Sequence, residues 1–179
     1  MELIDVLDEK GSKTGKTKTR ADIHRDGDWH RTVHVWFINS KKELLLQRRS
    51  KNMEVFPNKW HISVGGHINS REDEISAALR ETKEEIGIDL LPEELNLIGI
   101  IKEEGVLNNG TYFDNEFCNV YFVNKDLNIE NLKNNPEEIT ELQWISSKEF
   151  EKWSIEKNPE LVPQNEYPLV VKSVKNLTL

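Results

Sequence analysis

Residues 65–88 read GGHINSREDEISAALRETKEEIGI, and the rest of the chain is organised around this stretch. Two glycines and a short polar loop come first, and apolar residues then recur at helical spacing until a final glycine. On a helical wheel of ~100° per residue, Ile75, Leu79 and Ile86 fall on one face. The pattern therefore predicts an amphipathic helix over residues 73–87.

Three glutamates form a second face of this helix, ~140° from the apolar one. Glu81, Glu84 and Glu85 stand at i, i+3 and i+4, where like charges destabilise a helix by roughly 0.2–0.5 kcal/mol per pair. A divalent cation offsets this repulsion, and hard oxygen ligands suit Mg²⁺ or Mn²⁺ shared with substrate phosphates. The alternative is a solvated acidic face in which Arg80 pairs with Glu84, and the helix pattern alone leaves both open.

The spacing of the whole stretch is more specific than the three glutamates. It fits G-x5-E-x7-R-E-U-x-E-E-x-G-U, where U is a bulky apolar residue and Thr82 is the one imperfect position. This pattern is the Nudix box, and through it the chain resembles the Nudix hydrolase superfamily. The box covers residues 66–88, and its fixed positions are Gly66, Glu72, Arg80, Glu81, Glu84, Glu85, Gly87 and Ile88.

The resemblance implies an α/β (α+β) fold in which a mixed β-sheet is sandwiched between helices. Because 179 residues suit one domain, we expect residues 1–179 to form a single Nudix hydrolase domain. Turn-forming residues predict a turn at 10–15 and a loop at 103–111, and a last helix is expected after Pro168. Apolar alternation predicts strands at 2–8, 29–39, 43–49, 60–64, 95–102, 112–123 and 139–145.

The composition bounds the function class. The chain is 36% hydrophobic and 31% charged, has no apolar run near the ~18 residues of a membrane span, and opens without a secretory signal. The single cysteine, Cys118, forms no internal disulfide, so we expect a cytoplasmic protein. A net charge of −8 argues against a nucleic-acid partner. A small-molecule diphosphate bridged by cations is the expected partner, and the chain is expected to be a monomer or a homodimer.

The resemblance to the Nudix family assigns chemistry to the glutamates. Mg²⁺ (or Mn²⁺) orients a diphosphate and acidifies a bound water, and a carboxylate takes the proton from that water. Glu84 is the first choice for this base, while Glu81 and Glu85 hold metal with the Gly66 carbonyl. Some family members place the base outside the box. The candidate there is Glu116, for which an exposed strand acid is the alternative reading.

A second group of residues resembles the isopentenyl-diphosphate-isomerase-like branch of the superfamily. The matching segments are WHRTVHVWFIN at 29–39, LLLQRRS at 44–50, P-x-x-W at 57–60 and GGH at 65–67. True isomerases hold a divalent metal with three histidines and two carboxylates. The positions that match are His24, His30, His67, Asp114 and Glu116. His30 and His67 are alternatively hydrogen-bonding loop residues, and Asp114 has a shorter reach than the isomerases' glutamate.

One departure from the isomerases weighs against their reaction. They need a cysteine directly before the GH pair, and Gly65 stands there in this chain. We therefore expect hydrolysis of a diphosphate linkage in a nucleoside diphosphate derivative or similar small molecule. Isomerase-like activity and a non-catalytic nucleotide-sensing module remain the alternatives. Arg48 and Arg49 flank the expected pocket mouth, where they either contact phosphates or form solvated surface charge.

Overall fold

The computed structural model describes residues 2–177. Met1 and residues 178–179, the ends of the predicted 1–179 domain, lie outside the described part of the chain. In chain order, the elements that carry the fold are β1 (Leu3–Leu7), β2 (Lys13–Thr19), α1 (Arg20–Asp26), β3 (His30–Ile38), β4 (Glu43–Arg49), β5 (Trp60–His61), β6 (Val64–His67), α2 (Glu74–Ile86), β7 (Asn96–Leu107), β8 (Tyr112–Asn124), β9 (Ile139–Ser146), α3 (Ser147–Ile155) and α4 (Tyr167–Asn176).

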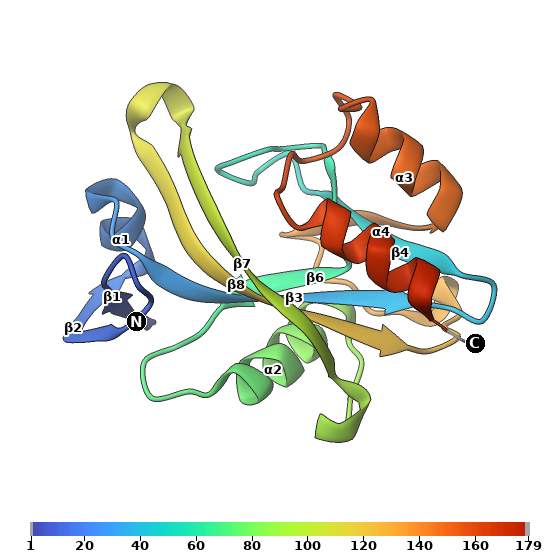
Figure 1. Cartoon of the computed structure of the whole chain (residues 1–179), viewed down its shortest axis with the longest axis horizontal. Helices are drawn as coiled ribbons and strands as arrows, with labels where there is room; N and C mark the ends of the chain where they lie inside the picture. The colour runs from blue at the N-terminus through green and yellow to red at the C-terminus, as the bar shows by residue number, and fades with distance from the viewer. Residues whose placement is uncertain (1, 178–179) are drawn as a thin grey trace.

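One mixed sheet forms the centre of the molecule. Its strand order is β5-β4-β3-β8-β7, with β6 also paired to β3 and β9 also paired to β4. β3 and β8 run parallel, whereas β4 and β6 lie antiparallel to β3. Helix α2 lies on one side of this sheet, and α3 and α4 lie on the other (Figure 1). The predicted mixed sheet between helices is therefore confirmed.

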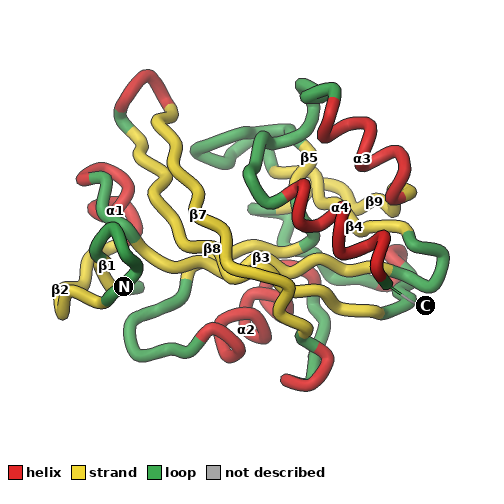
Figure 2. Tube along the Cα trace, in the orientation of Figure 1, coloured by secondary structure: helices red, strands yellow, loops and turns green. Residues whose placement is uncertain are grey.

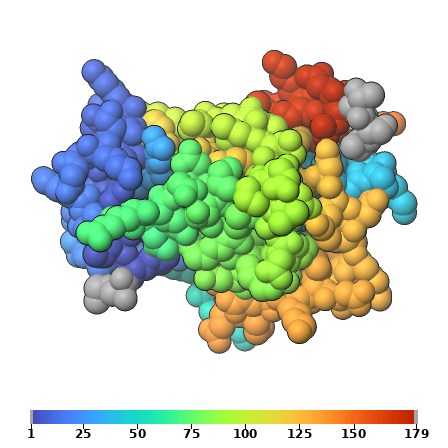
Figure 3. Space-filling model, turned by 90° about the horizontal axis from the view of Figure 1, so that it is seen from below, coloured from blue at the N-terminus to red at the C-terminus, as the bar shows by residue number. Residues whose placement is uncertain are grey.

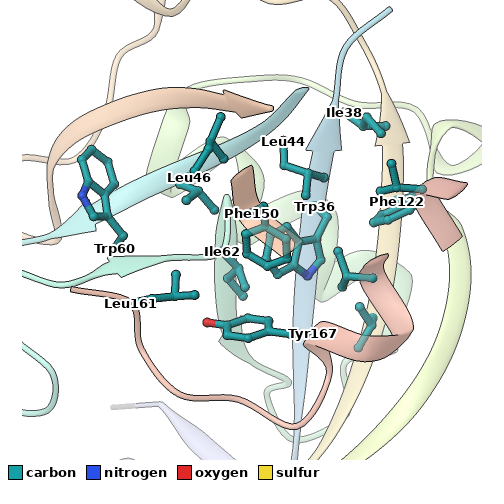
Figure 4. Packing of buried hydrophobic residues seen from close by; sticks show 14 of the residues in the cluster. Trp36, Ile38, Leu44, Leu46, Trp60, Ile62, Phe122, Phe150, Leu161 and Tyr167 are labelled. Carbon is teal, nitrogen blue, oxygen red and sulfur yellow. The ribbon is translucent and has the colours of Figure 1, made fainter. Parts of the chain in front are cut away.

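Strand β3 joins the two halves of the core because alternate side chains point to opposite faces of a sheet. Val35 belongs to the cluster that includes Ala78 of α2. Trp36, the next residue, packs edge-on against Phe150 of α3 and Tyr167 of α4 (Figure 4). The predicted strand with both faces buried is confirmed, and β3 fixes the positions of the strands and helices that pack against it.

Local capping determines where α2 begins and ends. The side chain of Asp73 accepts a hydrogen bond from the Ser76 backbone N–H at 2.8 Å, and Gly87 closes the helix in the left-handed region at φ 76°. Thr82, the imperfect box position, is buried and its hydroxyl donates to the Ala78 carbonyl at 2.7 Å. The predicted helix is confirmed, and the segment around it covers the middle of the molecule in Figure 3.

The buried face of α2 includes Ile86 of the predicted apolar face but is otherwise rotated from that face. Ala77, Ala78 and Glu85 are buried, while Ile75 and Leu79 are half-buried at the edge of the core. The small alanine side chains let the helix axis lie close to the sheet, so Glu85 faces the sheet. The three glutamates therefore do not share one solvated face.

Two loop predictions were wrong. Residues 13–19 form β2, which pairs with β1 in a separate two-stranded sheet. Residues 103–107 extend β7, which pairs with β8 up to Leu107 opposite Tyr112. Lys13–Thr19 carries no apolar residue, and residues 103–107 begin with two glutamates and a glycine, so the extended structure of both segments comes from backbone pairing and not from an apolar pattern. The lengthened β7–β8 hairpin rises away from the sheet (Figure 2).

The shorter helices agree with the sequence. Ser146 caps α3 by accepting a hydrogen bond from the Glu149 backbone N–H. Helix α4 carries Pro168 in its first turn and buries Val170 and Val174. No helix within residues 2–177 is both long enough and apolar enough to cross a membrane.

Candidate active site

A cavity of about 240 Å³ lies beside the N-terminal end of β3 and the acidic face of α2. Glu81, Glu84 and Glu85 line one part of its wall, together with Gly66 of β6. Basic side chains line another part, and among them is Arg49, which the sequence analysis placed at the expected pocket mouth. The cavity therefore brings carboxylates and a guanidinium to one small volume.

The three box glutamates occupy different environments within this wall. The side chain of Glu84 is 58% exposed, that of Glu81 is 12% exposed, and Glu85 is buried. Glu85 accepts hydrogen bonds from Gln47 Nε2 at 3.0 Å and from the Gly65 backbone N–H at 3.4 Å. Burial raises the pKa of Glu81 to about 7 and raises the pKa of Glu85 well above its usual value. The pKa of Glu81 is raised although Arg80 lies beside it, because burial outweighs the charge of the guanidinium.

Arg80 fixes the loop before α2 in place. Its guanidinium donates to both carboxylate oxygens of Glu72, at 2.9 and 2.8 Å, and to the backbone carbonyl of His67 at 3.0 Å. It also contacts Glu81 Oε1 at 2.7 Å and Glu84 Oε2 at 3.2 Å. The predicted Glu72–Arg80 scaffold pair is confirmed, and Arg80 orients the catalytic candidates from the same position.

Gly66 leaves room for the Glu81 carboxylate. A Cβ atom added at Gly66 would lie 2.1 Å from Glu81 Cδ, which no side chain can tolerate. The backbone of β6 at Gly66, which carries no side chain, is therefore in direct contact with the buried carboxylate of Glu81. The adjacent Gly65 is less constrained, because an added Cβ would lie 2.9 Å from Cδ1 of Ile62 and 3.4 Å from Cδ2 of His34.

A second cluster lies next to Gly66. Ligand atoms of His24, His30, His67 and Glu116 all lie within 4.8 Å of one another, and all four residues are buried. His24 Nε2 and His67 Nε2 are 3.0 Å apart, and His30 Nε2 is 3.4 Å from Glu116 Oε1. Asp114 stands further out, with its Oδ1 atom 3.8 Å from His24 Nδ1. Four of the five predicted positions thus converge within that distance, and the shorter aspartate does not.

The histidines of this cluster are arranged as metal ligands would be. Nδ1 of His24 lies 2.9 Å from the Phe113 carbonyl and Nδ1 of His30 lies 3.1 Å from the Asp28 carbonyl, so each donates outward. Their Nε2 lone pairs then face the centre, where His30 Nε2 is buried without a hydrogen-bond partner. Burial, reinforced by the nearby His30, lowers the pKa of His24 to about 4 and that of His67 well below its usual value. The neutral imidazoles of His24 and His67 at this spacing suit a divalent cation.

Some site residues are placed differently from the prediction or were not predicted. Arg48 lies 3.5 Å from Glu160 and over the Trp60 ring, and it is not among the residues that line the cavity. Arg20 and Gln47 line the cavity but were not predicted. Gln47 interrupts an apolar strand, LLLQRR, and this interruption was a usable signal. Arg20 offered none, because only the packing of α1 brings it there.

Comparison with known proteins agrees with the geometry. The sequence profile of the NUDIX domain matches residues 28–165. The chain belongs to the Nudix family. Nudix hydrolase 3 of Arabidopsis thaliana is 36% identical over 165 residues, which is 90% of this chain but only 21% of that protein. An uncharacterized Nudix hydrolase of Clostridium acetobutylicum is 38% identical over 152 residues, covering 83% of this chain and 72% of that protein.

Solved structures extend the agreement to the fold. The crystal structure of a Deinococcus radiodurans protein matches with a TM-score of 0.68 at 22% identity, covering 97% of this chain and 99% of that one. The Nudix fold predicted from the box is therefore confirmed. Isopentenyl-diphosphate Delta-isomerase of Escherichia coli is also similar, at 29% identity over 143 residues, 80% of this chain and 76% of that protein. The chain is a Nudix hydrolase with isomerase relatives, as the sequence predicted.

Proposed function

We propose that this Nudix hydrolase is a divalent-metal-dependent pyrophosphohydrolase. It cleaves a diphosphate linkage in a nucleoside diphosphate derivative or similar small molecule, with water attacking phosphorus. The observation that carries the proposal is the cavity in which all three box glutamates meet the Gly66 backbone and Arg49. Family membership supplies the reaction class, and the substrate and the metal are the new elements of the proposal.

Mg²⁺ or Mn²⁺ fits the box end of the cavity. Glu81 and Glu85 are buried carboxylates with pKa values raised by burial, and a cation there would favour their ionised form. Together with Glu84 and the Gly66 carbonyl they offer the hard oxygen ligands that these ions prefer. When bound, the ion supplies charge neutralisation of the diphosphate and acidification of a water.

Glu84 is the better of the two candidates for the general base. Its side chain is the most exposed of the three box glutamates, so it can exchange protons with solvent. Glu116 is instead engaged by Thr32 Oγ1, which donates to it at 3.1 Å, and by His30. Burial alone would raise the pKa of Glu116, but the neighbouring His30 lowers it well below its usual value. Because its pKa is low and Thr32 already donates a hydrogen bond to it, the Glu116 carboxylate is better suited to bind a metal than to accept a proton.

Arg49 is assigned to the substrate phosphates. Its guanidinium donates to the Val55 carbonyl at 3.2 Å and lies 3.5 Å from His61 Nδ1, and within residues 2–177 it forms no ion pair with a carboxylate. A half-buried guanidinium without an anionic partner is a ready contact for a phosphate. The same role does not extend to Arg48, which faces Glu160.

The histidine cluster supports a second ion, for which Mn²⁺ or Zn²⁺ suits the mixed imidazole and carboxylate ligands. It also keeps isomerase-like activity as the second candidate function. Two observations weigh against that candidate. Gly65 has no side chain that could donate a proton to an alkene. Cys118 is buried, and burial raises the pKa of its thiol to about 12. A non-catalytic sensing module is disfavoured because the box glutamates are intact and line an open cavity.

A turnover screen tests the proposal. It covers nucleoside di- and triphosphates, nucleotide sugars and isopentenyl diphosphate, each with and without Mg²⁺ or Mn²⁺. We expect metal-dependent cleavage of a diphosphate that falls by about 100-fold or more in Glu84→Gln, in line with loss of a general base. Glu93→Gln, an exposed glutamate outside the cavity, is the matched control and retains full activity. Formation of dimethylallyl diphosphate would instead establish the isomerase, and metal-dependent binding without turnover would establish the sensing module.

A further inference from the structure

His61 is a buried histidine in the wall of the cavity, and no step of the proposed reaction uses it. It is the last residue of β5 and lies opposite Gln47 of β4 in the antiparallel ladder. Because alternate residues of a strand point to opposite faces, Gln47, Arg49 and His61 share one face. Trp60 and Ile62, on either side of His61, belong to the apolar cluster on the other face (Figure 4). The core strands therefore hold His61 beside Arg49 at the cavity.

Two groups contact the guanidinium of Arg49. Its Nε donates to the Val55 carbonyl at 3.2 Å, and its Nη1 lies 3.5 Å from Nδ1 of His61. A guanidinium can only donate, so Nδ1 of His61 presents its lone pair and the ring proton lies on Nε2. Burial and the positive charge of Arg49 lower the pKa of His61 well below its usual value, which keeps the imidazole neutral. Neither contact therefore neutralises the charge of Arg49.

A carboxylate at position 61 would have the opposite effect on Arg49. Hydrogen bonds between a guanidinium and a carboxylate are roughly twice as strong as those between neutral groups. An incoming phosphate would then have to displace the carboxylate before it could bind the guanidinium. A neutral acceptor orients the same guanidinium without competing for its charge. Because Arg49 is half-buried, where the dielectric is lower than in water, that charge attracts a phosphate more strongly than an exposed one would.

We propose that His61 is a positioning residue, which orients the Arg49 guanidinium in the cavity and leaves its charge free for a phosphate group of the substrate. This inference rests on the proposed function, which assigns Arg49 to the substrate phosphates. It adds a requirement at a further position of the chain. The side chain at position 61 must accept a hydrogen bond and must carry no negative charge.

The test changes the charge at position 61 and keeps the shape of the side chain. His61→Asp and His61→Asn differ by one charge at nearly equal volume. Calorimetry with Mg²⁺ measures Kd for methylenediphosphonate, a diphosphate analogue whose bridging carbon resists hydrolysis, and turnover measures KM and kcat. We expect Kd and KM to be about tenfold higher in the Asp variant than in the Asn variant, with kcat within about twofold. The control Gln143→Glu adds the same charge at an exposed position of β9 outside the cavity and leaves Kd unaltered.

A double variant shows whether the effect of the charge passes through Arg49. Without a guanidinium to neutralise, Asp and Asn at position 61 should bind methylenediphosphonate equally in the Arg49→Gln background. A tenfold difference that persists in this background would mean that the carboxylate repels the phosphate directly. That result overturns the positioning role of His61.

A second pair of variants tests the hydrogen-bond acceptor and does not need the buried carboxylate to be tolerated. His61→Leu removes the acceptor without adding charge, whereas His61→Asn retains one. We expect the Leu variant to bind methylenediphosphonate about threefold to tenfold more weakly than the Asn variant, because Arg49 loses a partner that orients it. Urea denaturation of each variant confirms that it is folded. Equal Kd values for the two variants contradict the orienting role.

The outcomes separate this inference from the proposed function. Equal affinity of the Asp and Asn variants overturns the role of His61, while metal-dependent hydrolysis still stands. A difference in affinity that depends on Arg49, without turnover of any diphosphate, supports the role of His61 and contradicts the proposed hydrolysis. If methylenediphosphonate does not bind the wild-type chain with Mg²⁺, Arg49 has no phosphate role and the inference fails with it.

Discussion

Two adjacent glycines of β6 differ in what they can tolerate. A Cβ atom at Gly66 would lie within 2.2 Å of the Glu81 carboxylate, whereas the nearest atoms to one at Gly65 would be Ile62 Cδ1 at 2.9 Å and His34 Cδ2 at 3.4 Å. We expect Gly66→Ala to displace Glu81 and lower kcat/KM by about 100-fold, as a 1 Å misplacement of a catalytic group does. Gly65→Ala, the same change one residue earlier, retains most activity. Steady-state kinetics on both variants measure kcat/KM. An equal loss of kcat/KM in the two variants would contradict the contact between Gly66 and Glu81.

The residues of the site fall into groups according to whether, and by which signal, the sequence predicted them. Glu81, Glu84 and Glu85 were predicted because the box spacing is a local property of the chain. The histidines followed from a motif resemblance, and their convergence required the fold. Glu166, which lies outside the cavity and contacts His34 of its lining, had no signal in the sequence. It is fully buried because α4 carries it to within 2.7 Å of His34 on the central strand.

Helix α2 depends on a left-handed residue at its end. Gly87 has φ 76°, and an added Cβ would lie 3.1 Å from Lys133 Cβ and 3.2 Å from the Lys133 carbonyl oxygen. Gly15 has a similar φ of 83° with nothing within 4 Å, so Gly15→Ala measures the conformational penalty alone, about 1–2 kcal/mol. We expect Gly87→Ala to lower the free energy of unfolding by more than Gly15→Ala, because the contact with Lys133 adds to that penalty. Urea denaturation measures both, and an equal loss would show that the Lys133 segment moves freely.

At the scale of elements, prediction succeeded where the signal is local. The limits of α2 were predicted because Asp73 and Gly87 are local caps. Residues 103–107 were taken as a loop because their polarity hides a pairing with β8 that only the sheet creates. β2 was missed for the same reason, since Lys13–Thr19 carries hardly any apolar residues. Backbone pairing between distant segments is invisible to a pattern of side chains.

One buried ion pair ties the C-terminal helix to the centre of the molecule. Glu166 accepts from His34 Nδ1 at 2.7 Å and from Trp36 Nε1 at 2.9 Å. Burial alone would lower the pKa of His34, but the charge of Glu166 raises it well above its usual value. Stability from the pair is therefore complete below the unfolded pKa near 6.5 and is lost as the pH rises through the higher folded pKa.

The variant Glu166→Gln measures how much the His34–Glu166 ion pair contributes to the free energy of unfolding. We expect the variant to lose about 3–5 kcal/mol of unfolding free energy at pH 6, as when one partner of a buried pair is removed. The difference from the wild type should be smaller at pH 9, because a higher pH shifts His34 towards its neutral form. Urea denaturation at the two pH values provides the readout. A constant difference would mean that hydrogen bonding, and not charge, holds the helix.

The parallel pairing of β3 with β8 also bears on how the protein is made. Thr32 and Cys118 are neighbours across this ladder although 86 positions separate them. A ribosome adding ~5–20 residues per second exposes the histidine-bearing strand several seconds before Glu116 exists. A nascent chain that ends before residue 116 therefore lacks one of the four converging ligands, however long it waits. A cation held by all four residues of this cluster is therefore acquired only after synthesis has passed β8.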